Sequence, residues 1–127
     1  MSKTARYSIM NEPRPKRGEV WTVDFDPTRG AEIQKQRPAV VISSDSIGKL
    51  PLKLVVPITA WNSAFENHIW HVRLDPAPQN GLTKLSAADA LQVRSVAVDR
   101  FLNCRGRVTQ QELEEITQAL AAVIELT

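Results

Sequence analysis

The stretch of sequence that decides the fold is residues 18–43, which read GEVWTVDFDPTRGAEIQKQRPAVVIS. Residues 19–25 alternate between two faces, and the large apolar side chains Trp21, Val23 and Phe25 share one of them. This period of two is typical of a half-buried strand. The Asp-Pro-Thr-Arg-Gly run that follows predicts a turn, because proline pre-sets φ and glycine permits a positive φ.

A lone arginine, Arg37, stands at the end of the loop, directly before a second predicted strand. Residues 39–42 form a continuous apolar run of the length of a buried strand, and Pro38 biases Arg37 toward extended backbone. The sequence therefore places a permanent cation where a loop meets a rigid element, a common position for binding and catalytic residues. A surface ion pair with Glu32 or Asp45 is the alternative role for this arginine.

Length and composition favour a single globular domain. The chain has 127 residues, 43% of them hydrophobic, and no apolar run of membrane-spanning length. Its one cysteine, Cys104, cannot form an internal disulfide, which favours a reducing compartment, and we expect a cytoplasmic protein that does not enter a membrane.

Charge is unevenly distributed although the net charge is only +2. Residues 1–17 carry five Lys and Arg against one Glu, whereas residues 111–127 carry four Glu and no cation. Such runs are commonly solvated surface, and a basic tail also attracts phosphates. We expect residues 1–16 to be a flexible N-terminal extension and residues 17–127 to form the domain.

The rest of the chain reads as short strands followed by one helix. Further strands are expected at 52–57, 69–74 and 90–98, with a short helical turn at 99–102. Thr109 and Glu112 match a capping box, and apolar residues at helical spacing follow it to residue 124. Short strands without βαβ alternation predict a mainly β fold, a small, strongly curved sheet or barrel, with a C-terminal α-helix.

The sequence offers little for a metal or cofactor, and we expect none. His68 and His71 are three residues apart, and on a strand this odd spacing would point them to opposite faces. Walker-type, nucleophile-elbow and dinucleotide-binding glycine motifs are missing from the sequence.

Four motif blocks occur in one order along the chain: GEVWTVDFDPTRGAE, RPAVVIS, VVPIT at 55–59 and LQVRSV at 91–96. Together they resemble the MazF/PemK family, ribonuclease toxins of bacterial toxin–antitoxin pairs, over roughly residues 17–126. The resemblance implies an SH3-like curved β-barrel of the CcdB/PemK type with an appended helix.

The resemblance also implies roles for individual residues. Arg37 matches the arginine that holds the scissile phosphate, and Thr59 matches a hydroxyl that hydrogen-bonds it. Glu32 is the candidate for proton transfer or for contact with a base edge, with solvent exposure or a surface ion pair with Arg29 or Lys35 as its alternative. The candidate RNA-binding residues are Arg29, Lys35, Gln36, Gln92 and Arg94.

The chain departs from the family pattern next to Gln92. The family commonly has an acidic residue directly before this glutamine, where this chain has Leu91. Asp89, two places earlier, replaces that acid only if the strand begins early enough to include it. His71 is read as a surface residue, with proton transfer as its alternative.

The activity implied is metal-independent, sequence-selective endoribonuclease cleavage of single-stranded RNA, leaving 2′,3′-cyclic phosphate and 5′-hydroxyl ends. The implied partners are a cognate antitoxin and a second copy of the chain in a homodimer. Two alternatives stay open. One is a toxin of the same fold that binds DNA gyrase without nuclease activity, and the other is a degenerate member that binds RNA or antitoxin but cuts slowly.

Overall fold

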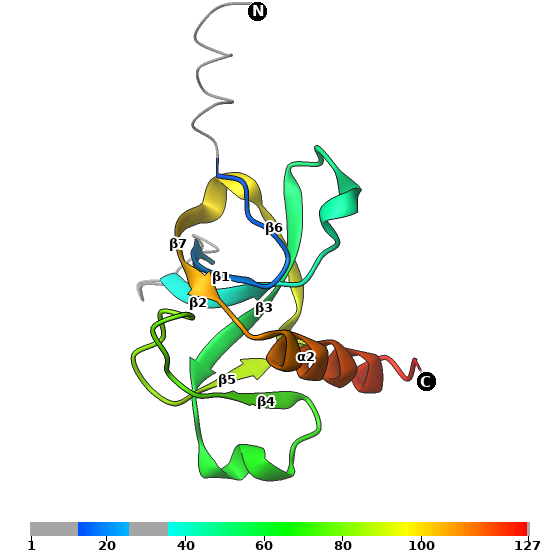
Figure 1. Cartoon of the computed structure of the whole chain (residues 1–127). Helices are drawn as coiled ribbons and strands as arrows, with labels where there is room; N and C mark the ends of the chain where they lie inside the picture. Colours follow the sequence, from blue (N-terminus) through cyan, green and yellow to red (C-terminus); the bar gives the residue numbers. More distant parts are fainter. Residues whose placement is uncertain (1–12, 26–35, 127) are drawn as a thin grey trace, which may run out of the picture.

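The computed structural model describes residues 13–25 and 36–126, and these form one antiparallel sheet with a single C-terminal α-helix (Figure 1). The strands are β1 (Glu19–Asp24), β2 (Gln36–Val41), β3 (Leu52–Ala60), β4 (His71–Leu74), β5 (Ser86–Asp89), β6 (Arg94–Ala97) and β7 (Phe101–Arg107), and the helix is α2 (Gln110–Val123). Single 3₁₀ turns connect them: η1 (Asp45–Ile47), η2 (Ser63–Asn67), η3 (Ala90–Gln92) and η4 (Val98–Arg100).

The long central strand β3 joins the two halves of the sheet. The strand order is β4-β5-β3-β2-β1-β7, with β6 pairing with β3 off this path. The first half of β3 pairs with β6 and β2, and its last residues pair with β5. The predicted mainly β class with a terminal helix is confirmed. The sheet is not closed, however: in the described part of the chain β4, β6 and β7 each pair with one strand only, so "barrel" describes its curvature only.

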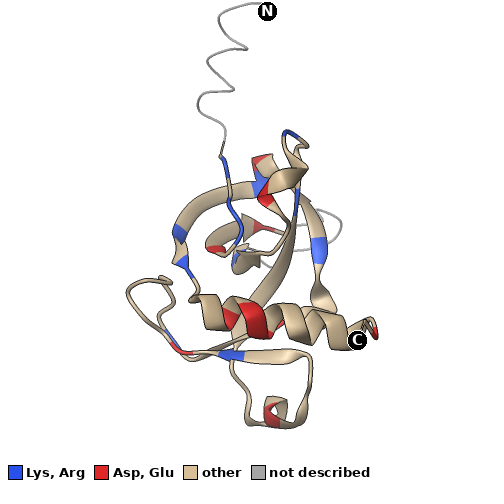
Figure 2. Ribbon diagram, turned by 45° about the vertical axis from the view of Figure 1, so that its right-hand side comes forward, with Lys and Arg blue, Asp and Glu red and all other residues tan. Residues whose placement is uncertain are grey.

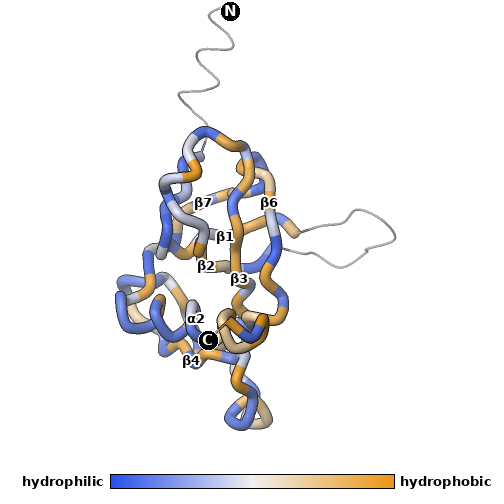
Figure 3. Tube along the Cα trace, turned by 90° about the vertical axis from the view of Figure 1, so that its right-hand side faces the viewer, coloured by the Kyte–Doolittle hydropathy of each residue, from blue (hydrophilic) through white to orange (hydrophobic). Residues whose placement is uncertain are grey.

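Each face of the sheet buries its own apolar cluster. One face contains Val20, Val40 and Val56 and is covered by the helix, whereas the other contains Val23, Phe25 and Phe101. The predicted alternation of β1 is confirmed, because neighbouring side chains of this strand enter opposite clusters. Figure 3 shows the hydrophobic stretches following the strands while the connections are mostly hydrophilic.

Helix α2 begins at the predicted capping box. The Glu112 backbone N–H donates to Thr109 Oγ1 at 3.0 Å, and the Thr109 N–H donates to Glu112 Oε1 at 2.9 Å. Leu113, Ile116 and Ala119 are buried where the helix contacts β4 and η3. The exposed side of α2 carries the acidic residues, drawn red in Figure 2. At 14 residues, α2 is too short to cross a membrane, and the described ranges hold no longer helix.

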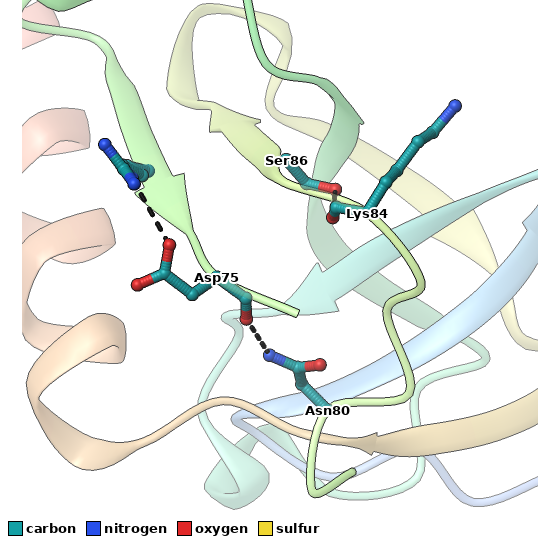
Figure 4. A network of polar contacts seen from close by, with 5 residues as sticks. Asp75, Asn80, Lys84 and Ser86 are labelled. Atoms are coloured by element: carbon teal, nitrogen blue, oxygen red, sulfur yellow. Dashed lines mark hydrogen bonds and ion pairs between the residues drawn. The ribbon is translucent and has the colours of Figure 1, made fainter. Parts of the chain in front are cut away.

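The turn at 75–81 is built around a buried asparagine. Asn80 is 3% exposed, and its side-chain oxygen accepts from the backbone N–H groups of Ala77 and Leu82. Its amide donates to the Asp75 carbonyl at 2.9 Å (Figure 4). Gly81 follows at φ +70°, where a Cβ would lie 2.4 Å from the Arg105 carbonyl oxygen. The turn therefore requires glycine at this position.

The region from residue 86 to residue 107 differs from the prediction. A single strand was expected at 90–98, but β5 ends at Asp89, η3 turns the chain, and β6 begins at Arg94. The helical turn expected at 99–102 occurs as η4, one residue earlier, and β7 follows it as a further strand. Residues 1–12 lie outside the described part, so the predicted boundary after residue 16 stays a prediction.

Candidate active site

A pocket of about 410 Å³ opens where β3 passes from its pairing with β2 to its pairing with β5. Six elements or their ends contribute side chains to it, from residue 25 after β1 to residue 94 in β6. The lining residues are Phe25, Arg37, Pro57, Ile58, Thr59, Asp89, Gln92 and Arg94. Four of the sequence-predicted site residues are among them.

Arg37 reaches the pocket from the second residue of β2. Its backbone pairs with Val23 of β1, so a rigid ladder fixes where the side chain starts. The alternative partner Asp45 is engaged elsewhere, because its Oδ1 accepts from the Arg17 backbone N–H at 2.9 Å. In the ranges that the structure describes, no carboxylate forms an ion pair with Arg37. Its guanidinium therefore lines the pocket without an acidic partner among the described residues.

Thr59 lies in the last part of β3, after the end of the strand that the sequence predicts. The expected strand 52–57 continues to Ala60, because β5 supplies a second pairing partner for its end. Thr59 pairs with Ala87 of β5, and its half-buried side chain lines the pocket. A hydroxyl on a paired strand is well placed to hold a ligand at a fixed distance from Arg37.

Gln92 and Arg94 line the pocket from two different elements. Gln92 ends η3 and Arg94 begins β6, so the two residues do not lie on the single strand expected at 90–98. The Arg94 guanidinium lies over the Phe25 ring, with its carbon 5.1 Å from the ring centroid. This cation–π contact orients a second positive group toward the pocket. The sequence pattern places Phe25 on the apolar face of a strand and does not indicate that it lines a site.

Of the four site candidates in the loop between β1 and β2, the structure describes only Gln36. Arg29, Glu32 and Lys35 lie outside the described residues. Gln36 is the first residue of β2, opposite Asp24 in the register, and its side chain is exposed. It does not line the pocket.

Asp89 supplies a carboxylate to the pocket. It is the last residue of β5 and shares no strand with Gln92, so the condition set for it is not met; Asp89 lines the pocket because β5 ends there. Its Oδ1 accepts from the Leu91 backbone N–H at 3.1 Å, which caps η3 and turns Leu91 outward. This aspartate N-cap was the sequence signal for the break in the expected strand.

His71 is buried, and the prediction of a surface residue is wrong. Its side chain is 6% exposed, and its Nε2 lies 3.5 Å from Asp89 Oδ2. Burial lowers the pKa of His71 below the ordinary value of 6.5. The Asp89 carboxylate raises this pKa and His68 lowers it further, and burial together with His68 outweighs Asp89.

The prediction that His68 and His71 point to opposite faces is also wrong. Strand β4 begins at His71, and His68 ends the η2 turn, so strand alternation does not apply between them. Their Nδ1 atoms are 3.0 Å apart. In the described ranges no group of three or more His, Cys, Asp or Glu is placed to hold a metal ion.

The charges of the pocket suit an anionic ligand. Arg37 and Arg94 contribute two permanent cations, and Asp89 contributes one carboxylate. Guanidinium groups bind the oxygens of phosphates in a bidentate manner, and the Thr59 hydroxyl and Gln92 amide add neutral donors. The arrangement can bind a phosphodiester and oppose negative charge that builds on it.

Comparison with known proteins shows which family the chain resembles. The sequence model of the PemK-like, MazF-like toxins of type II toxin–antitoxin systems matches residues 16–124. The chain is 38% identical over 117 residues to the endoribonuclease MazF9 of Mycobacterium tuberculosis, covering 87% of this chain and 97% of that protein. It is 33% identical over 112 residues to the endoribonuclease toxin MazF of Escherichia coli K12, covering 87% and 94%.

Solved structures share the fold. A MazF structure from Deinococcus radiodurans aligns with a TM-score of 0.71 at 23% identity, covering 91% of this chain and 100% of that chain. A mycobacterial endoribonuclease in complex with its cognate antitoxin aligns with a TM-score of 0.70 at 19% identity, covering 90% and 98%.

Proposed function

This chain belongs to the PemK-like, MazF-like family of toxins of type II toxin–antitoxin systems, and from that premise we propose that it is a sequence-selective endoribonuclease. It cleaves single-stranded RNA, including mRNA, without a metal ion. The 2′-hydroxyl attacks the adjacent phosphorus, and the products are a 2′,3′-cyclic phosphate and a 5′-hydroxyl. The observation that carries the proposal is the gathering of Arg37, Thr59, Gln92 and Arg94 around one pocket.

In this reaction Arg37 is the cation that stabilises the phosphorane. Its planar fork of donors matches two nonbridging oxygens, and the pentacoordinate phosphorus carries more negative charge on them than the ground state. Thr59 donates a hydrogen bond that positions the same phosphate. A neutral threonine hydroxyl is a poor base, so proton transfer falls to a carboxylate, Glu32 or Asp89.

Sequence selection requires that unstacked bases be read on their edges. Gln92 and Arg94 offer an amide and a guanidinium to the pocket, and the Phe25 ring supports the Arg94 guanidinium from below. The loop residues Arg29, Lys35 and Gln36 complete the proposed RNA-binding set. We assign binding rather than chemistry to all of these groups.

The proposed partners are a cognate antitoxin and a second copy of this chain in the cytoplasm. An acidic antitoxin segment would compete with RNA for the two arginines of the pocket. For the homodimer, support comes from exposed leucines at positions 50, 52 and 54, an apolar surface that a monomer leaves in water. Light scattering on the purified chain should then give about twice the 14.2 kDa mass of one copy.

The test is cleavage of a mixed-sequence single-stranded RNA in excess EDTA by the wild type and Arg37→Ala. Arg73→Ala serves as the matched control, because Arg73 is an exposed arginine that pairs with Asp75 outside the pocket. We expect site-selective cuts with cyclic phosphate ends for the wild type and Arg73→Ala only. Absence of cutting by the wild type, or equal cutting by all three, would reject the proposal. Gyrase inhibition or RNA binding without cleavage would then identify one of the two alternatives.

A further inference from the structure

Asp89, His71 and His68 form a continuous chain of polar groups that starts at the pocket. Asp89 and His71 are register partners on β5 and β4, and the His71 Nε2 lies 3.5 Å from Asp89 Oδ2. On its other side, His71 Nδ1 lies 3.0 Å from His68 Nδ1. The Asp89 side chain is 16% exposed, so its access to water is limited.

Aromatic stacking fixes both imidazole rings. The Phe65 ring stacks on His71 at a centroid distance of 3.7 Å and an angle of 5°. The Trp70 ring stacks on His68 at 4.3 Å and 9°. Because neither ring can rotate without losing its stacking partner, the nitrogen atoms keep their directions along the chain. The hydrogen bond from the Leu91 backbone N–H to Asp89 Oδ1 holds the carboxylate in place.

The nitrogen positions permit two complementary proton arrangements. A hydrogen bond between two Nδ1 atoms requires that one of them carry a proton and the other not. In the first, His71 is protonated on Nδ1, donates to His68 Nδ1 and leaves its Nε2 free to accept, and His68 carries its own proton on Nε2. In the second, His71 is protonated on Nε2 beside the ionised Asp89, and its Nδ1 accepts from His68 Nδ1.

We propose that Asp89 is the proton acceptor for the attacking 2′-hydroxyl, and that His71 and His68 return it to its ionised form. This inference rests on the proposed ribonuclease function. As the 2′-oxygen bonds to phosphorus, its proton passes to Asp89 and the bond from phosphorus to the 5′-oxygen breaks. The relay starts from the first arrangement: the proton moves from Asp89 to His71 Nε2, the His71 Nδ1 proton moves to His68 Nδ1, and the His68 Nε2 proton passes to water, which leaves the second arrangement. In the reverse direction, His68 Nε2 takes a proton from water, the His68 Nδ1 proton moves to His71 Nδ1, the His71 Nε2 proton moves to Asp89, and Asp89 gives it to the 5′-oxygen. This restores the first arrangement, so the reaction has no net proton change.

The 3.5 Å separation of His71 and Asp89 fits an unliganded site. Catalytic hydrogen bonds are often long without substrate and shorten in the complex. Neutral His71 suits this role, because a relay residue must be able to accept a proton on one nitrogen while it donates from the other.

The experiment compares single-turnover cleavage and RNA binding across matched variants. Asp89→Asn removes the proton acceptor, and His71→Phe keeps a ring against Phe65 but removes both nitrogens. Asp75→Asn is the control, an exposed carboxylate near the end of β4 that does not line the pocket. Binding is measured with an RNA that carries a 2′-deoxy sugar at the cleavage site, and thermal unfolding checks that each variant folds.

We expect Asp89→Asn to lower the cleavage rate by about 100-fold or more, which is the range of general acid–base catalysis, with RNA affinity within about threefold of wild type. His71→Phe should lower the rate at least about tenfold, and Asp75→Asn should not change it. Nitrogen-detected NMR should show wild-type His71 protonated on Nδ1 and His68 on Nε2. In Asp89→Asn, His71 should titrate at a lower pH than in the wild type.

The outcomes separate this inference from the proposed function. If the wild type cleaves and Arg37→Ala does not, but Asp89→Asn cleaves like the wild type, the relay is wrong and the ribonuclease function stands. If the wild type does not cleave, both are wrong. Unchanged His71 titration in Asp89→Asn would also overturn the relay, because the two groups would then not be coupled.

Discussion

The Arg37→Lys variant tests whether cleavage requires the planar geometry of the Arg37 guanidinium or only its positive charge. In Arg37→Lys the positive charge stays, but a single ammonium cannot hold two phosphate oxygens in one plane. We expect the cleavage rate to fall by about 100-fold, as for loss of one transition-state donor, with an unchanged melting temperature because Arg37 is exposed. Arg73→Lys is the matched control. Near wild-type cleavage by Arg37→Lys would show that charge alone is sufficient.

Asn80 is the residue on which the 75–81 turn depends. Asn80→Ala leaves the backbone N–H groups of Ala77 and Leu82 without their acceptor and the Asp75 carbonyl without its donor (Figure 4). We expect the free energy of unfolding to fall by about 2–3 kcal/mol, measured by urea denaturation. Gln79→Ala, an exposed amide in the same turn, should change it by less than about 0.5 kcal/mol. Equal losses in both variants would contradict this account.

At the scale of single elements, the cap of α2 gives a prediction that sequence and structure share. Thr109→Ala removes the side-chain acceptor for the Glu112 N–H at the start of the helix. The expected loss is about 1 kcal/mol of unfolding free energy, whereas Thr109→Ser should retain most of it because the hydroxyl remains. Chemical denaturation monitored by helical circular dichroism measures both. A Thr109→Ser variant as unstable as Thr109→Ala would show that the methyl contact, and not the cap, stabilises the helix.

Elements with a local signal could be predicted from the sequence, and elements held by distant partners could not. The alternation of β1 and the capping box of α2 are local patterns, and both were found. Strand β7 has no clean alternation; it exists because β1 pairs with it through an irregular register. Residues 90–98 were read as one strand because the turn at η3 depends on the Asp89 cap and on the packing of α2 against it.

At the scale of the whole molecule, the candidate site depends on the path of β3. Motif resemblance identified Arg37, Thr59, Gln92 and Arg94 one by one. These residues come together around one pocket because β3 pairs with β6 and β2 along its first part and with β5 at its end. Asp89 could not be assigned from its motif, because its position depends on where β5 ends. His71 was misplaced because its neighbours Phe65 and Asp89 come from other elements.

The burial of His71 makes the stability of the whole fold depend on pH. Its pKa is lowered in the folded protein, so below an ordinary value of 6.5 the unfolded chain binds a proton that the folded chain does not. Stability from this group is therefore complete above pH 6.5 and is lost as the pH falls toward the lower folded pKa. The charged groups beside it are Asp89, which opposes the shift, and His68, which reinforces it; Arg73, on the same side of β4, is paired with Asp75.

We therefore expect the free energy of unfolding of the wild type to decrease when the pH is lowered from about 7.5 to about 5.5, measured by urea denaturation at each pH. His71→Phe keeps the stacked ring but cannot be protonated, so its stability should decrease less over the same interval. The difference between the two curves isolates His71 from the other titrating groups, which both proteins share. Parallel curves would mean that His71 has the same pKa in the folded and unfolded chains. A steeper fall for His71→Phe would mean that Asp89 outweighs burial and that His71 is held in its charged form.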